Sequence, residues 1–131
     1  MIVADTHVII WYALKPEMLS KIAKIAMDEA NRSDGIICCD ISLWEIAMLM
    51  HKGRLQIDVE YLEFIALVLE SSRYIVKSIT PEIAELSVST FADGNKDPAD
   101  RIISATSVVE KARLVTADKF MRQSKYVTTT W

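Results

Sequence analysis

Five carboxylates are placed along the chain so that they could act together: Asp5, Glu45, Asp97, Asp100 and Asp118. Two carboxylates about 4 Å apart repel each other by roughly 1 kcal/mol in water and roughly 4 kcal/mol at an effective dielectric constant near 20. A crevice that gathers four of them therefore needs a divalent cation, and oxygen ligands favour Mg²⁺ or Mn²⁺ over zinc. Such an ion suits phosphodiester hydrolysis, in which a carboxylate outside the coordination sphere can orient or deprotonate the attacking water.

Each of these carboxylates also has a purely structural interpretation. Ser42 and Glu45 have the spacing of a capping box at the start of a helix. Asp97 can cap a helix that begins with the following proline, and Asp100 would then favour the helix dipole. The other two acids can close turns. For each acid taken singly, the structural interpretation is favoured. For all of them together it is weaker, because every cap would have to lie at the same edge of the predicted sheet.

The elements that would position these acids alternate between strands and helices. Apolar runs predict strands at residues 1–4, 36–39, 74–79, 114–116 and 126–129. Helical patterns run from a Ser20 cap to about residue 32, from a Ser42 cap to Gly53, and onward from Asp58. Further helices are expected at about 81–91 and 98–112, with a short helix or turn at 119–124. This order predicts one α/β domain over residues 1–131, a parallel sheet of about four to five strands with helices on both faces, and the acids at its carboxyl edge.

Composition excludes several other classes of protein. The chain has 131 residues, of which 51% are hydrophobic and 25% are charged, which is typical of a folded domain. Its three glycines, Gly35, Gly53 and Gly94, are too far apart for a glycine-rich nucleotide loop. The adjacent Cys38 and Cys39 set up no disulfide framework, and no apolar run is long enough for a membrane span. We therefore expect a reduced cytoplasmic protein without a membrane contact.

Charge is unevenly distributed along the chain. Residues 1–100 carry nine basic and sixteen acidic side chains, whereas residues 101–131 carry six basic and two acidic ones, a net charge of +4. Among the basic residues, Arg101, Lys119 and Arg122 are candidates for contact with the phosphates of RNA. A solvated helix face is the commoner explanation of such charge and stays open as the alternative.

Four sequence blocks, in order and with matching spacing over the whole chain, resemble PIN-domain ribonucleases and, among them, the VapC-type toxins of bacterial toxin–antitoxin pairs. They are Asp5-Thr6-His7-Val8-Ile9-Ile10-Trp11, Ser42-Leu43-Trp44-Glu45-Ile46-Ala47 with Gly53-Arg54-Leu55, Asp97-Pro98-Ala99-Asp100-Arg101-Ile102-Ile103, and Leu114-Val115-Thr116-Ala117-Asp118. By this resemblance, the quartet that binds Mg²⁺ or Mn²⁺ and carries catalysis corresponds to Asp5, Glu45, Asp100 and Asp118. The same comparison gives supporting roles behind the quartet to Asp97, Thr116 and Thr6.

The resemblance also implies partners. Members of this family cleave RNA, usually form homodimers, and are neutralised by a small VapB-type antitoxin whose tail occupies the acidic groove. Single-stranded or looped RNA is the expected target, with tRNA or another structured RNA among the candidates, because in-line attack needs a splayed backbone.

Two other classes of protein compete with this interpretation. A signalling receiver domain is also a parallel α/β fold with acids at strand ends, but it needs a second acid beside Asp5 and an acceptor Asp ending a central strand. Ala4 and Thr6 flank Asp5, and the strand at 74–79 is followed by Thr80 and Pro81. The second competitor is a non-catalytic PIN-like binding domain, against which the presence of all four acids argues.

Overall fold

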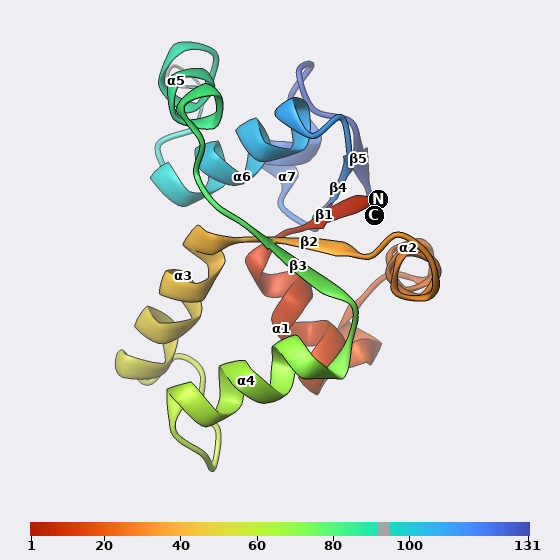
Figure 1. Cartoon of the computed structure of the whole chain (residues 1–131), viewed down its shortest axis with the longest axis vertical. Coiled ribbons are helices and arrows are strands. Elements are labelled where there is room, and N and C mark those ends of the chain that lie inside the picture. Colours follow the sequence, from red (N-terminus) through yellow and green to blue (C-terminus); the bar gives the residue numbers. More distant parts are fainter. Residues whose placement is uncertain (92–94) are drawn as a thin grey trace.

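The structure is a computed structural model that describes residues 1–91 and 95–131. A single five-stranded sheet with the strand order β3-β2-β1-β4-β5 forms its centre, and every neighbouring pair of strands is parallel (Figure 1). The strands are β1 (Ile2–Ala4), β2 (Ile36–Cys39), β3 (Tyr74–Lys77), β4 (Arg113–Val115) and β5 (Thr129–Thr130). The helices are α1 (Thr6–Leu14), α2 (Lys21–Arg32), α3 (Asp40–His51), α4 (Tyr61–Ser71), α5 (Pro81–Ser89), α6 (Pro98–Val109) and α7 (Lys119–Arg122), with a 3-10 turn at Pro16–Met18. The predicted parallel α/β fold is confirmed.

The strand order determines where a ligand can bind. The chain builds outward from β1 through β2 to β3, and then crosses to the other side of β1 to form β4 and β5. In open α/β sheets the crevice at such a reversal, outside the carboxyl ends of the strands, is the usual ligand site. Here that crevice lies where β1 and β4 end, next to Asp5 and Thr116.

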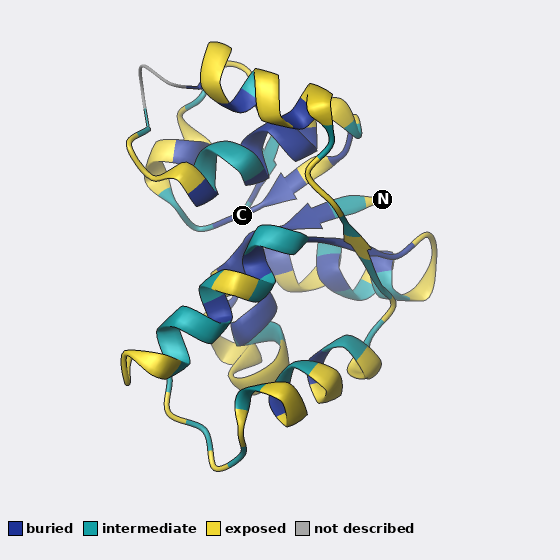
Figure 2. Cartoon of the chain, turned by 60° about the vertical axis from the view of Figure 1, so that its left-hand side comes forward, coloured by how far each residue is buried: buried dark blue, intermediate teal, exposed yellow. Residues whose placement is uncertain are grey.

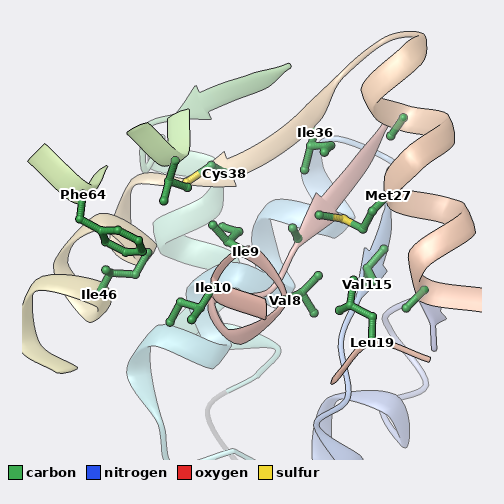
Figure 3. Packing of buried hydrophobic residues seen from close by; sticks show 14 residues of the cluster. Val8, Ile9, Ile10, Leu19, Met27, Ile36, Cys38, Ile46, Phe64 and Val115 are labelled. Carbon is green, nitrogen blue, oxygen red and sulfur yellow. The ribbon is translucent and has the colours of Figure 1, made fainter. Parts of the chain in front are cut away.

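Side chains alternate between two hydrophobic cores, one on each face of the sheet. On β1, Ala4 packs into a core with α1 to α4, whereas Val3 packs into a second core with α5, α6 and α7. Both faces of the central strands are therefore buried under helices, whose outer sides are exposed (Figure 2). This burial explains why these strands are apolar throughout. Figure 3 shows the first core, with α1 contributing Val8, Ile9 and Ile10.

Several helix ends follow the predicted capping chemistry. Ser20 caps α2 by accepting a hydrogen bond from the backbone N–H of Ala23, and Thr80 caps α5 ahead of Pro81. Gly53 follows the C-cap of α3 with a φ of +71°, and the N–H groups of Gly53 and Arg54 bond back into the last turn of α3. This is the glycine-terminated helix end that the sequence indicates.

Other boundaries were predicted wrongly. Helix α3 begins directly after β2 with Cys39 as its N-cap, so Ser42 is not a cap and the capping box with Glu45 does not form. Helix α4 begins at Tyr61 rather than at Asp58. The last strand is shorter and later than predicted, Thr129–Thr130. Helices α5 and α6 end at Ser89 and Val109, earlier than expected, and β3 ends at Lys77; part of the predicted loop at 92–96 lies outside the described residues.

Helix α1 was not predicted at all. Its sequence is apolar on nearly every side, with Val8, Ile9 and Ile10 in the core and Trp11 and Tyr12 packed at the margin of that core. A helix without a polar stripe gives no 3.6-residue signal. Within the described residues, no helix is both long and apolar enough to cross a membrane.

Candidate active site

A cavity of about 370 Å³ opens at the carboxyl edge of the sheet, at the reversal between β1 and β4. It is lined by Asp5, Thr6, His7, Trp11, Glu45, Asp97, Asp100, Ala117 and Asp118. The four acids of the predicted quartet thus come from four separate parts of the chain and line one cavity. Asp97 lies there as well.

Asp5 and Asp118 are held together by Thr116. The fully buried Thr116 hydroxyl donates to Asp5 Oδ2 at 2.7 Å and accepts a hydrogen bond from the backbone N–H of Asp118 at 3.0 Å. Asp5 also caps α1 through the N–H of Thr6, and Asp118 caps α7 through the N–H of Met121. Each acid therefore has one side-chain oxygen committed to a helix start, which fixes its direction.

Glu45 is positioned by a relay of hydroxyl groups. Thr6 Oγ1 donates a hydrogen bond to Glu45 Oε1. Thr6 Oγ1 also lies 2.8 Å from Ser42 Oγ. Since a hydroxyl carries one proton, Ser42 is the donor to Thr6 in this chain of hydrogen bonds. Ser42 is fully buried inside α3. This serine, which the sequence assigned to a helix cap, instead orients Thr6 and, through Thr6, the carboxylate of Glu45.

Asp97 and Asp100 stand in the first turn of α6. Asp97 Oδ1 accepts hydrogen bonds from the backbone N–H groups of Ala99 at 2.9 Å and Asp100 at 3.4 Å, so its predicted role as an N-cap is confirmed. Asn95 Nδ2 donates to Asp100 Oδ2 at 3.2 Å. Sequence reasoning missed Asn95, since a lone asparagine in a loop carries no motif.

The electrostatics of the cavity disfavour charge on its acids. Burial raises the pKa of Asp5, against the opposing hydrogen bond from Thr116. Burial also raises the pKa of Glu45, and the charges of Asp5 and Asp97 add to the increase. For Asp100, burial and then the charges of Asp5, Asp97 and Asp118 raise the pKa to about 7, although the hydrogen bond from Asn95 opposes them. Among the described residues, no ion pair joins any of these acids to a basic side chain.

The types of residue that line the cavity fit a hard divalent cation. All the candidate donors are carboxylate oxygens, and both oxygens of Asp5 keep a free lone pair beside the hydrogen bond that each accepts. In residues 1–91 and 95–131, however, no three acidic, histidine or cysteine side chains are arranged closely enough to hold an ion as they stand. The structure therefore supplies carboxylate oxygens that could bind a cation, and these carboxylates form no ion pair among the described residues.

The predicted RNA-contacting residues are close in sequence to acids that line the cavity, but they do not line it themselves. Arg101 follows Asp100 on α6, whereas Lys119 and Arg122 are exposed on α7 directly after Asp118. His7 and Trp11, whose rings lie 5.7 Å apart, do line the cavity. His7 lies within the first motif, but no role was predicted for it because a lone exposed histidine has no spacing signal.

Comparison with known proteins decides the family. A family model described as "PIN domain" matches residues 2–125. The chain belongs to the PIN-domain family. Over 125 residues it is 32% identical to Ribonuclease VapC22 from Mycobacterium tuberculosis (strain ATCC 25618 / H37Rv), which covers 95% of this chain and 92% of that relative. The predicted resemblance is thus confirmed, and the receiver-domain alternative is wrong.

Solved structures share the fold of this PIN domain. A toxin–antitoxin complex from Klebsiella pneumoniae matches with a TM-score of 0.68 and 20% identity, over 98% of this chain and 97% of the other. VapBC2 from Rickettsia felis, crystallised with a DNA fragment from its promoter, matches with a TM-score of 0.70 and 15% identity over the same shares. At these identities the likeness establishes the fold.

Proposed function

We propose that this PIN domain is a Mg²⁺- or Mn²⁺-dependent endoribonuclease that hydrolyses RNA phosphodiester bonds as the toxin of a toxin–antitoxin pair. The observation that carries the proposal is the cavity at the sheet reversal, which Asp5, Glu45, Asp100 and Asp118 all line and where none of them forms an ion pair among the described residues. The similarity to a protein named as a ribonuclease supports RNA as the substrate.

The four carboxylates of this quartet would hold the divalent cation. When bound, the cation would supply neutralisation of the phosphate charge and a lowered pKa for water. The hydroxyl groups of Thr116 and Thr6 donate hydrogen bonds to Asp5 and Glu45, and so restrict the directions that these two carboxylates can take. Asp97 caps α6 and adds negative charge behind Asp100. A carboxylate that does not bind the ion can accept the proton of the attacking water.

The substrate strand would lie between this acidic cavity and the basic residues next to it. Arg101 directly follows Asp100 on α6, Lys119 directly follows Asp118 at the start of α7, and Arg122 ends α7; all three supply positive charge. Such residues attract phosphates without reading a base. Single-stranded or looped RNA, as in a tRNA loop, has the splayed backbone that in-line attack requires.

A VapB-type antitoxin is the proposed protein partner, and a homodimer the proposed assembly. The solved structures with this fold include complexes described as toxin–antitoxin and as VapBC2. Uncompensated carboxylates in an open cavity favour a basic segment of an antitoxin as the inhibitor, since it would occupy the place of the cation.

Ribonuclease assay of an Asp5→Asn variant tests the proposal. We expect purified wild-type protein to cleave RNA with Mg²⁺ or Mn²⁺, and Asp5→Asn to lose at least about 100-fold in rate, a loss in the range for removal of a preorganised electrostatic group. Glu85→Gln, which changes an exposed acid on α5, is the matched control and should keep full activity. Undiminished cleavage by Asp5→Asn would exclude this site.

Melting temperature gives a second readout that does not depend on the RNA chosen. Millimolar Mn²⁺ should raise the melting temperature of the wild type but not that of an Asp5→Asn, Asp100→Asn double variant, because only a cation bound to the native state stabilises it. An equal rise in both proteins would place the cation elsewhere.

A further inference from the structure

A second cavity, of about 470 Å³, lies on the same side of the sheet as α6 and is formed mainly around α7. We name it the α7 pocket. Residues that line it include Phe91, Asn95, Phe120, Gln123, Lys125 and Tyr126. None of these six lines the acidic cavity, so the proposed hydrolysis does not explain why they are arranged here.

Aromatic rings form the apolar wall of the α7 pocket. Phe91 is buried, and its ring meets that of Tyr126 edge-on, with centroids 5.9 Å apart at 86°. Tyr126 and Phe120 are each about half exposed, at 53% and 52%. Half-exposed aromatic side chains that line a cavity are candidates for ligand contact, and a flat ring system is the partner that such rings stack on.

Polar and charged groups complete the lining. Gln123 offers an amide donor and an amide acceptor, which can read the edge of a base. The amide of Asn95 bonds to the Asp100 carboxylate and to the backbone N–H of Asp97. The ammonium group of Lys125 lies over one face of the Tyr126 ring, 5.2 Å from its centre, which leaves the other face for stacking. Aromatic faces, amides and one cation together match a nucleotide better than a purely apolar ligand.

The α7 pocket adjoins the acidic cavity. Asn95 lines the α7 pocket and donates its side-chain N–H to Asp100, which lines the acidic cavity. Helix α7, which supplies Phe120 and Met121 to the pocket, begins directly after Asp118. Asn95 therefore connects the α7 pocket to an acid of the quartet that would face a phosphate of the RNA strand.

We propose that the α7 pocket binds one unstacked nucleobase of the RNA strand and so determines which phosphodiester bond reaches the acids. This inference rests on the proposed ribonuclease function. Phe120 and Tyr126 stack on the base, Gln123 contacts its edge, and Lys125 contacts a phosphate. The pocket is thus a specificity site separate from the quartet.

RNA binding to a protein that does not cleave separates the two proposals. Fluorescently labelled hexamers of rA, rC, rG and rU are titrated into Asp5→Asn protein and into the same protein with Phe120→Ala or Tyr126→Ala added. Each added substitution should weaken binding of the preferred hexamer about 10-fold, as expected for loss of one stacked base. Leu62→Ala, an exposed apolar residue on α4 (78% exposed), is the control and should bind like the parent.

Cleavage mapping gives the second measurement. In the otherwise wild-type protein, Gln123→Ala, at an exposed residue on the rim, should shift the distribution of cut sites without unfolding the protein. Unchanged binding in both aromatic variants, or an unchanged distribution of cut sites, overturns the proposal. If Phe120→Ala instead turns a dimer into a monomer in sedimentation while RNA binding is kept, the pocket is a contact between two copies of the chain and the proposal is wrong. If the wild type cleaves no RNA but RNA binding still depends on Phe120 and Tyr126, the proposed ribonuclease function is wrong and the proposed base binding in the α7 pocket is retained.

Discussion

Replacement of Asp100 by asparagine should stabilise the protein when no divalent cation is present, and should do so in a pH-dependent way. Asp100 has a pKa raised to about 7 by burial and by the charges of three neighbouring acids. The amide oxygen of asparagine can still accept the hydrogen bond from Asn95. The substitution therefore removes a repelled charge and leaves the packing of α6 nearly unchanged.

The magnitude follows from the pKa of Asp100. Because this pKa is raised in the folded state, the folded protein holds a proton that the unfolded chain releases near its usual value of 3.8. The contribution of Asp100 to folding stability is therefore fully present below about pH 4 and is lost as the pH rises through about 7. A rise of about three pKa units corresponds to roughly 4 kcal/mol. Since Asp100 is only partly buried, solvent screening reduces this to about 1–2 kcal/mol.

Urea unfolding in the presence of EDTA measures this effect. At about pH 8, the free energy of unfolding of Asp100→Asn should exceed that of the wild type by about 1–2 kcal/mol, which is about 3–8 °C in melting temperature for a chain of this size. At about pH 5 the gain should be less than half as large, because most of the charge penalty has not yet developed. Glu85→Gln should change neither value by more than about 0.5 kcal/mol. A gain of equal size at both pH values, or none at about pH 8, would refute the electrostatic reasoning.

Three further predictions concern the groups that support the site. Thr6→Val removes the donor to Glu45 and should lower the rate of RNA cleavage about 10-fold while costing about 1–2 kcal/mol in urea unfolding; Thr6→Ser should restore both. Thr116→Val leaves Asp5 without a donor and should cost about 1–3 kcal/mol, and a stability equal to that of the wild type would contradict the buried hydrogen bond. Gly35→Ala should lower the melting temperature, because φ is +106° and an added Cβ would lie 2.9 Å from a backbone oxygen; an unchanged value would mean that the turn relaxes freely.

The predictions from sequence succeeded where a local pattern has one physical cause. Apolar runs with both faces buried identified most of the strands, and the acids that follow them identified the edge of the sheet. Capping chemistry worked at Ser20 and Thr80, since a hydroxyl that accepts from the N3 amide is a local contact. The same rule failed at Ser42, because its hydroxyl bonds to Thr6, 36 residues away, instead of to its own helix.

What the sequence determined by itself was the identity and order of the acids, the parallel α/β architecture and the family motifs. Only the tertiary structure decided how the acids are held: the pairing of Asp5 with Thr116 spans 111 residues, and no local spacing encodes it. The same holds for the α7 pocket, whose wall joins Phe91 and Asn95, which precede α6, to Tyr126, which follows α7. Backbone patterns are set by neighbours in the chain, whereas hydrogen bonds between side chains and the lining of a cavity depend on how the sheet and helices pack.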